Sequence, residues 1–199
     1  MKSRTVTIRL ALSVIAAALV AVSLSGAASA SSSERGTSVR GTQPSVLNGS
    51  GVKSAASLHL TAEQRTELDK QVADQLRITP GAERISLNEV AWTEGTGKVV
   101  MTFAVPGIEP LAAADCPFQW VCVYNGATFN YPRAAYFNCG TFGIPSTIGV
   151  SSWHNNQTNG TESTLFDGAG VNLQVNQALS KVSYVGAPSN DRARSIHVC

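Results

Sequence analysis

The chain has 199 residues, of which 43% are hydrophobic and 14% charged, with 15 Lys and Arg residues against 13 Asp and Glu residues. Three of the basic residues and none of the acidic ones lie in the first 30 positions, so the remainder carries 12 basic and 13 acidic side chains, a formal charge of −1. Such a chain lacks the basic surface that nucleic-acid binding needs. We therefore expect no nucleic-acid partner.

Residues 1–30 have the organisation of a secretory signal peptide. Basic side chains begin the segment, residues 10–24 are apolar and uncharged, and Ala28-Ser29-Ala30 fits a cleavage site of small residues. The alternative is a transmembrane anchor, but the apolar run is shorter than the roughly 20 residues that span a bilayer. We therefore predict a secreted, extracellular protein with no membrane contact after signal removal.

All four cysteines follow the predicted signal peptide. An even number of cysteines in a chain bound for an oxidising compartment favours disulfides over zinc ligation or free thiols. Cys116 and Cys122 bracket only five residues. Of the possible pairings we predict that these two form one bridge, which leaves Cys139 to join Cys199. The alternative for Cys199 is a free thiol.

Residues 31–56 are rich in Ser and Gly and poor in large apolar side chains. They cannot bury enough surface to offset the entropy of ordering, so we predict a disordered linker. Residues 57–108 are predicted to hold a helix and a hairpin. Thr61 and Gln64 have the spacing of a capping box, and apolar residues recur every four positions after it. These apolar positions are Leu68, Val72 and Leu76.

Two strand-like runs follow the helix, residues 84–92 and 98–105, with a Gly-containing turn between them. A helix and one hairpin have too little core for confident independent folding. The segment 57–108 is therefore either an N-terminal part that packs on the following domain or a pro-region that is removed. An Ala-rich connector near residues 106–114 is where such a cut would fall.

Residues 116–153 read CPFQWVCVYNGATFNYPRAAYFNCGTFGIPSTIGVSSW. A CPxxxxCxY opening is followed by Phe129, five positions after Tyr124 and across an Asn-Gly pair that favours a tight turn. This order, with a later Ser-Ser pair, resembles a βγ-crystallin motif and, more narrowly, the secreted microbial metallopeptidase inhibitors of peptidase inhibitor family I-thirty-six. Over residues 115–199 the resemblance implies a mainly β fold, a two-motif βγ-crystallin-like Greek-key sandwich preceded by the small helix and hairpin.

A second, less regular motif is expected after the first, with strands near residues 163–166, 171–175, 179–185 and 195–199. Apolar and polar residues alternate over 171–176, which predicts a half-buried strand. Two motifs of this size fit one β-sandwich with a shared core. The core candidates are Val121, Val123, Phe129, Ile148, Val150, Leu165, Leu173, Val175, Ile196 and Val198.

The resemblance also implies a calcium-binding stretch of the form N/D-N/D-x-x-S/T-S, and calcium needs six to eight oxygen ligands. Residues 147–152 keep the serines, including Ser151, but not the acid or amide pair. The second motif keeps Asn190 and Asp191, but Arg194 stands where a hydroxyl belongs. We therefore predict no metal and no cofactor, with Asn190, Asp191 and Ser151 as the remaining calcium candidates.

The residue pattern argues against an enzyme. The three histidines, His59, His154 and His197, are far apart in sequence, and neither HExxH nor GxSxG occurs. The few carboxylates after residue 115 have no spacing that suggests an acid/base pair. His154 is interpreted as a surface residue of a strand, and no residue is predicted to be catalytic.

Binding remains, and the family resemblance implies an inhibitor of an extracellular peptidase, with a metallopeptidase favoured. We expect the protein to be a monomer. Its mechanism would be a rigid, disulfide-braced loop inserted into the peptidase cleft, because a preorganised loop loses little entropy on binding. One candidate loop lies between Cys116 and Cys122 and the other follows Cys139. The candidate inhibitory residues are Pro117, Phe118, Gln119, Trp120, Phe142 and Ile144.

The alternative is a non-catalytic module that binds cell wall or glycan, or serves a structural role. It would stack sugars on exposed aromatic side chains. The aromatic candidates for that surface are Trp120, Tyr131, Tyr136 and Trp153. Asn48, Asn156 and Asn159 lie in N-x-S/T sequons, which matter in a host that glycosylates them.

Overall fold

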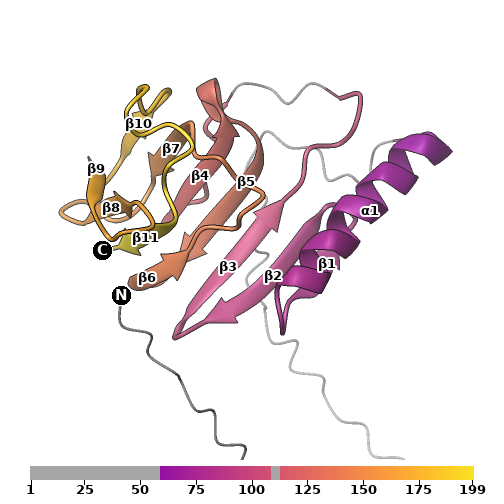
Figure 1. Ribbon diagram of the computed structural model, residues 1–199, viewed down its shortest axis with the longest axis horizontal. Helices are drawn as coiled ribbons and strands as arrows, with labels where there is room; N and C mark the ends of the chain where they lie inside the picture. Colours follow the sequence, from indigo (N-terminus) through magenta and orange to yellow (C-terminus); the bar gives the residue numbers. More distant parts are fainter. Residues whose placement is uncertain (1–58, 109–112) are drawn as a thin grey trace, which may run out of the picture. The chain divides into compact units, whose positions relative to one another are not determined.

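The computed structural model describes residues 59–108 and 113–199 (Figure 1). The signal peptide predicted over 1–30 and the linker predicted over 31–56 lie outside the described residues. The described chain is mainly β, as predicted, with one α-helix and eleven strands in two antiparallel sheets. The elements are α1 (Ala62–Ile78), β1 (Glu83–Ser86), β2 (Glu89–Glu94), β3 (Gly97–Thr102), β4 (Trp120–Gly126), the 3₁₀ turn η2 (Ala127–Phe129), β5 (Asn130–Phe137), β6 (Gly140–Gly143), β7 (Ser152–Asn155), β8 (Glu162–Phe166), β9 (Asn172–Gln177), β10 (Ser180–Val182) and β11 (Ser195–Val198).

The larger sheet has seven strands in the order β1-β2-β3-β5-β4-β7-β10, and the smaller has four in the order β6-β11-β8-β9. One face of the larger sheet contacts α1 at β1 and β2, as Figure 1 shows. The same face packs against the smaller sheet, where Tyr136 of β5 meets Phe142 of β6 at 5.5 Å between ring centroids. One hydrophobic core therefore lies under both the helix and the smaller sheet.

Helix α1 begins at the predicted capping box. The Thr61 hydroxyl accepts from the Gln64 backbone N–H at 3.2 Å, and the Gln64 side chain accepts from the Thr61 N–H at 2.9 Å. Leu68 and Val72 are fully buried on the face that their four-residue spacing predicts. The capping box and the apolar stripe together confirm the predicted helix.

The segment after α1 forms three strands rather than the single hairpin predicted. The run 84–92 divides into β1 and β2 around Leu87 and Asn88. Asn88 is buried. Its side-chain amide donates to the Phe103 carbonyl at 3.1 Å, and its backbone carbonyl accepts from the Phe103 N–H at 2.9 Å. Because a buried amide must find partners, Asn88 fixes a turn where the sequence suggested a continuous strand.

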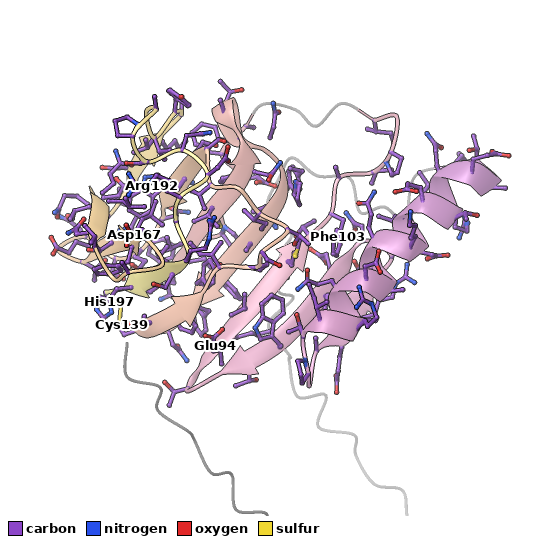
Figure 2. All side chains as sticks on the ribbon, viewed as in Figure 1. Glu94, Phe103, Cys139, Asp167, Arg192 and His197 are labelled. Atoms are coloured by element: carbon purple, nitrogen blue, oxygen red, sulfur yellow. A yellow bond between two sulfur atoms is a disulfide. The ribbon has the colours of Figure 1, made fainter. Side chains whose placement is uncertain are left out.

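Strand β3 joins the N-terminal elements to the rest of the larger sheet. It pairs with β5 from Lys98 opposite Phe137 to Thr102 opposite Arg133. The carboxylate of Glu94, labelled in Figure 2, also accepts from the Gly143 N–H at 2.8 Å. The segments predicted as 57–108 and 115–199 thus share one sheet and one core in the described residues, and removal of the first as a pro-region stays a prediction.

Most of the predicted core residues are buried, but β9 is an exception. Val175 is 44% exposed and Leu173 only half-buried. Opposite the buried Leu165 stands Gln174, so Gln174 faces inward. Its side-chain oxygen accepts from the Trp153 indole N–H at 3.1 Å. The prediction for Val175 is wrong because a polar partner for the buried tryptophan takes the inward position.

Both predicted disulfides are present. Cys116 is bonded to Cys122, and Cys139 to Cys199 with a sequence separation of 60. The long bridge ties the chain just before β6 to the residue that follows β11, and in the chain-entropy model it contributes about 4 kcal/mol. Cys199 is therefore not a free thiol. No helix within residues 59–108 and 113–199 is long and apolar enough to span a membrane.

Candidate functional site

The short disulfide encloses a tight turn formed by residues 117–120. The Trp120 N–H donates to the Pro117 carbonyl at 3.2 Å, which closes the turn. Gln119, the third residue of the turn, has a φ of 74°. Type II turns require a positive φ at this position, and residues other than glycine rarely adopt it. We call residues 116–122 the braced turn. Its backbone is held in one conformation by the bridge and by this closing bond.

Asn156, which follows β7, anchors the braced turn from outside. Its backbone carbonyl accepts from the Gln119 N–H at 2.8 Å, and its N–H donates to the Trp120 carbonyl at 2.9 Å. Its side-chain amide donates to the Cys116 carbonyl at 2.8 Å. One residue thus bonds the start and the end of the turn, and its side-chain amide nitrogen, the atom of the sequon that glycosylation would use, is already engaged.

Some side chains of the braced turn pack against the larger sheet, and others face solvent. Trp120 is buried and its ring lies 5.0 Å from that of Phe137 on β5, so it fastens the turn to the larger sheet. Phe118 is 62% exposed, and Gln119 is also exposed. Of the four inhibitory candidates in this loop, Phe118 and Gln119 face solvent, Pro117 is half-buried and Trp120 serves as an anchor.

A buried ion pair fixes the residue immediately before the braced turn. The Arg133 guanidinium lies 2.9 Å from the Asp115 carboxylate, and their side chains are 4% and 6% exposed. The hydroxyls of Tyr124 and Tyr131 both donate to the same carboxylate. Arg133 also donates to the Asp115 carbonyl at 2.9 Å and to the Thr102 hydroxyl at 3.1 Å. This network connects β3, β4 and β5 to the base of the turn.

Burial raises the pKa of both tyrosines in this network well above the ordinary range, and the negative charge of Asp115 adds to the effect. Tyr124 and Tyr131 therefore stay protonated and act as donors to the carboxylate. Sequence reasoning missed the network because its members are scattered along the chain. One signal was available: Arg133 is the only Asp, Glu, Lys or Arg between residues 116 and 161.

The second candidate inhibitory loop does not present its apolar side chains. Phe142 is 2% exposed and Ile144 8% exposed, and both belong to the main core. The Phe142 ring fills the space above Gly97, where an added Cβ would lie 2.2 Å from a ring carbon. Phe142 and Ile144 are therefore not accessible as the predicted inhibitory contacts, because both are buried and β6 turns Phe142 toward Tyr136 of β5.

The aromatic surface considered for glycan binding is not formed. Trp120, Tyr131, Tyr136 and Trp153 are at most 9% exposed. Tyr136 and Trp153 lie in the main core between the two sheets, whereas Trp120 lies in the smaller cluster on the other face of the larger sheet. Buried rings cannot stack on a sugar, so these residues do not supply the surface that the alternative function needs.

The three calcium candidates lie close together, and Asn190 and Asp191 are bonded to each other, whereas the buried Asn190 Oδ1 has no hydrogen-bond partner among the described residues. The Asp191 N–H donates to the Val150 carbonyl, next to Ser151, at 3.2 Å. The Asn190 side-chain amide donates to the Asp191 carboxylate at 2.7 Å. Arg194 donates to the Asp191 carbonyl at 2.8 Å, which places a positive charge beside the loop. Within the described residues no group of three or more His, Cys, Asp or Glu side chains could hold a metal ion.

His154 on β7 is buried rather than on the surface, so its interpretation as a surface strand residue is wrong. It is 4% exposed and stands between Cys122 of β4 and Lys181 of β10. Its Nδ1 has no hydrogen-bond partner among the described residues. Burial, together with the positive charge of Lys181, lowers the pKa of His154 to about 4. The side chain is therefore neutral in the folded protein near neutral pH.

This pKa predicts a pH-dependent stability. The unfolded histidine has a pKa near 6.5 and the folded one a pKa of about 4, so protonation favours unfolding and stability falls as pH drops between these values. Between about pH 7 and about pH 5 we expect the wild type to lose about 2 kcal/mol more than a His154→Gln variant. Urea unfolding at both pH values measures the difference. Equal losses for the two proteins would contradict the assignment.

No protein-family model, no curated protein and no solved structure matches the chain.

Proposed function

We propose that this chain is a secreted peptidase inhibitor with a βγ-crystallin-like fold, and that it blocks the cleft of an extracellular peptidase with the braced turn. A metallopeptidase is the favoured target. The protein acts without chemistry of its own: it occupies the cleft and excludes substrate. The two disulfides are consistent with an oxidising compartment.

The strand order supports the crystallin-like part of this proposal. The described strands from β4 onward fall into two consecutive sets of four, β4 to β7 and β8 to β11. In each set the third strand lies in the sheet opposite to its three companions: β6 lies in the smaller sheet and β10 at the edge of the larger one. In each set the fourth strand pairs with the first, β7 with β4 and β11 with β8, which is the neighbour relation of a Greek key.

The observation that carries the inhibitory proposal is the braced turn itself. The turn that carries the exposed Phe118 is held by a disulfide, by its closing hydrogen bond and by three hydrogen bonds to Asn156. A loop fixed before binding loses less conformational entropy when it enters a cleft. The glycan-binding alternative has no comparable feature, because its aromatic candidates are buried.

Titration of peptidases with the oxidised protein tests the proposal. We expect stoichiometric loss of activity of at least one metallopeptidase, followed as residual activity. A Cys116→Ser, Cys122→Ser variant keeps the long bridge and loses about 2 kcal/mol of chain-entropy stabilisation, so it should fold but inhibit much more weakly. Absence of inhibition of every peptidase at roughly micromolar protein, where a specific complex should form, would refute the proposed function.

A further inference from the structure

We infer that Phe118 selects the partner of the braced turn, and that this partner is a peptidase whose specificity subsite accepts a large apolar side chain. The inference rests on the proposed function and narrows it, because it names the class of peptidase that the turn would block. Its basis is the way in which the fold exposes and supports this one side chain.

Phe118 is 62% exposed, and no large hydrophobic side chain among residues 59–108 and 113–199 is more exposed. Single exposed apolar residues are common on protein surfaces, so exposure alone decides little. The support beneath Phe118 distinguishes it. Pro117, before Phe118, accepts a hydrogen bond within the turn, and Gln119, after it, donates to Asn156 outside the turn. Trp120 is buried against Phe137.

Rigid support of this kind is what a binding anchor needs. Aromatic residues dominate the energy of protein interfaces when they fill a pocket on the partner. With its backbone already fixed, Phe118 has only its two side-chain torsions to lose on binding, so little entropy opposes its insertion. The fold therefore presents an aromatic side chain at small entropic cost and leaves it without an intramolecular pocket.

Charge narrows the class of partner. Between residues 116 and 161 the only charged Asp, Glu, Lys or Arg is Arg133, which is buried in its ion pair with Asp115. Two lysines lie on the same face of the larger sheet, each two strands away from the braced turn. Lys98 on β3 is in line with Trp120 across β5, and Lys181 on β10 is in line with Cys122 across β7. A subsite with a carboxylate, suited to Lys or Arg, would hold an unpaired buried charge against Phe118. A peptidase with an apolar subsite has no such penalty.

Exchange of Phe118 in the full, oxidised chain tests the inference. We would measure inhibition constants against a metallopeptidase that cleaves beside large apolar residues and a serine peptidase that cleaves beside Lys or Arg. Phe118→Ala should weaken inhibition of the first by roughly 30- to 1,000-fold, the range for an interface anchor. Phe118→Leu, which keeps a large apolar group, should remain within about tenfold of the wild type.

Tyr184→Ala is the matched control, because Tyr184 is another exposed aromatic residue, at 53% exposure, outside the turn. It should leave the inhibition constant unchanged. Inhibition by the wild type that survives Phe118→Ala would overturn the inference and leave the proposed function standing. A wild type that inhibits only the Lys- or Arg-selective peptidase would overturn it also. A wild type that inhibits neither enzyme class, nor any other peptidase, overturns the proposed function and the inference with it.

Discussion

A chain cut to begin at Asp115 is expected not to fold stably. Residues 59–108 contribute five side chains that are at most 1% exposed in the common core: Leu68, Val72, Val90, Val99 and Met101. At about 1.5 to 3 kcal/mol for each buried side chain, their loss removes roughly 10 kcal/mol, which equals the whole stability of many domains. The cut would also leave β5 without its partner β3.

Far-ultraviolet circular dichroism and urea unfolding of the oxidised proteins measure this effect. The control is a chain cut to begin at residue 59, which keeps α1 and all eleven described strands and should unfold like the full chain. Cooperative unfolding of the 115–199 chain at a similar urea midpoint would contradict the expectation. It would instead support the prediction that residues up to 108 form a removable pro-region.

Features with a local signal were predictable from the sequence. The capping box at Thr61 and Gln64 and the four-residue apolar spacing specify α1 within a single segment. The six-residue separation of Cys116 and Cys122 allows a bridge whatever the rest of the fold does, and the other two cysteines then have one pairing left. In both cases the interacting groups lie close together in the chain or are few enough to enumerate.

Features that depend on distant partners were not predictable. Alternation along β9 predicted Leu173 and Val175 as core residues, but Gln174 faces the core because Trp153, on another strand, needs an acceptor for its indole N–H. Phe142 likewise looked like an accessible loop residue and is buried because Gly97 leaves room for its ring. No single segment carries either relation, since each requires knowing which strands are neighbours.

In the candidate site, too, the features with a local signal were predictable and the contacts between distant residues were not. Its disulfide and the run 117–121 follow from the sequence, and the exposed Phe118 is among the predicted inhibitory residues. The anchors came only from the structure: Asn156 lies 40 residues from Cys116, and Arg133 18 residues from Asp115. Hydrogen bonds across such separations leave no periodic pattern.

Replacement of Arg133 by methionine is expected to destabilise the protein by about 3 to 5 kcal/mol, the range for breaking a buried ion pair. The change removes the cation and leaves the Asp115 carboxyl group without its partner in a site where its side chain is 6% exposed. Urea unfolding near neutral pH gives the loss. Since Asp115 directly precedes Cys116, the variant should also weaken peptidase inhibition by loosening the base of the braced turn.

Two further variants distinguish the loss of stability caused by breaking the ion pair from the loss caused by removing any arginine side chain. Arg77→Met removes an arginine whose pair with Asp74 is 72% and 56% exposed, so it should change stability by less than about 1 kcal/mol. Asp115→Asn combined with Arg133→Met removes both charges and should recover part of the loss, because no unpaired ion stays buried. If the double variant is as unstable as the sum of its single variants, the two residues act independently and the ion pair does not hold the base of the turn.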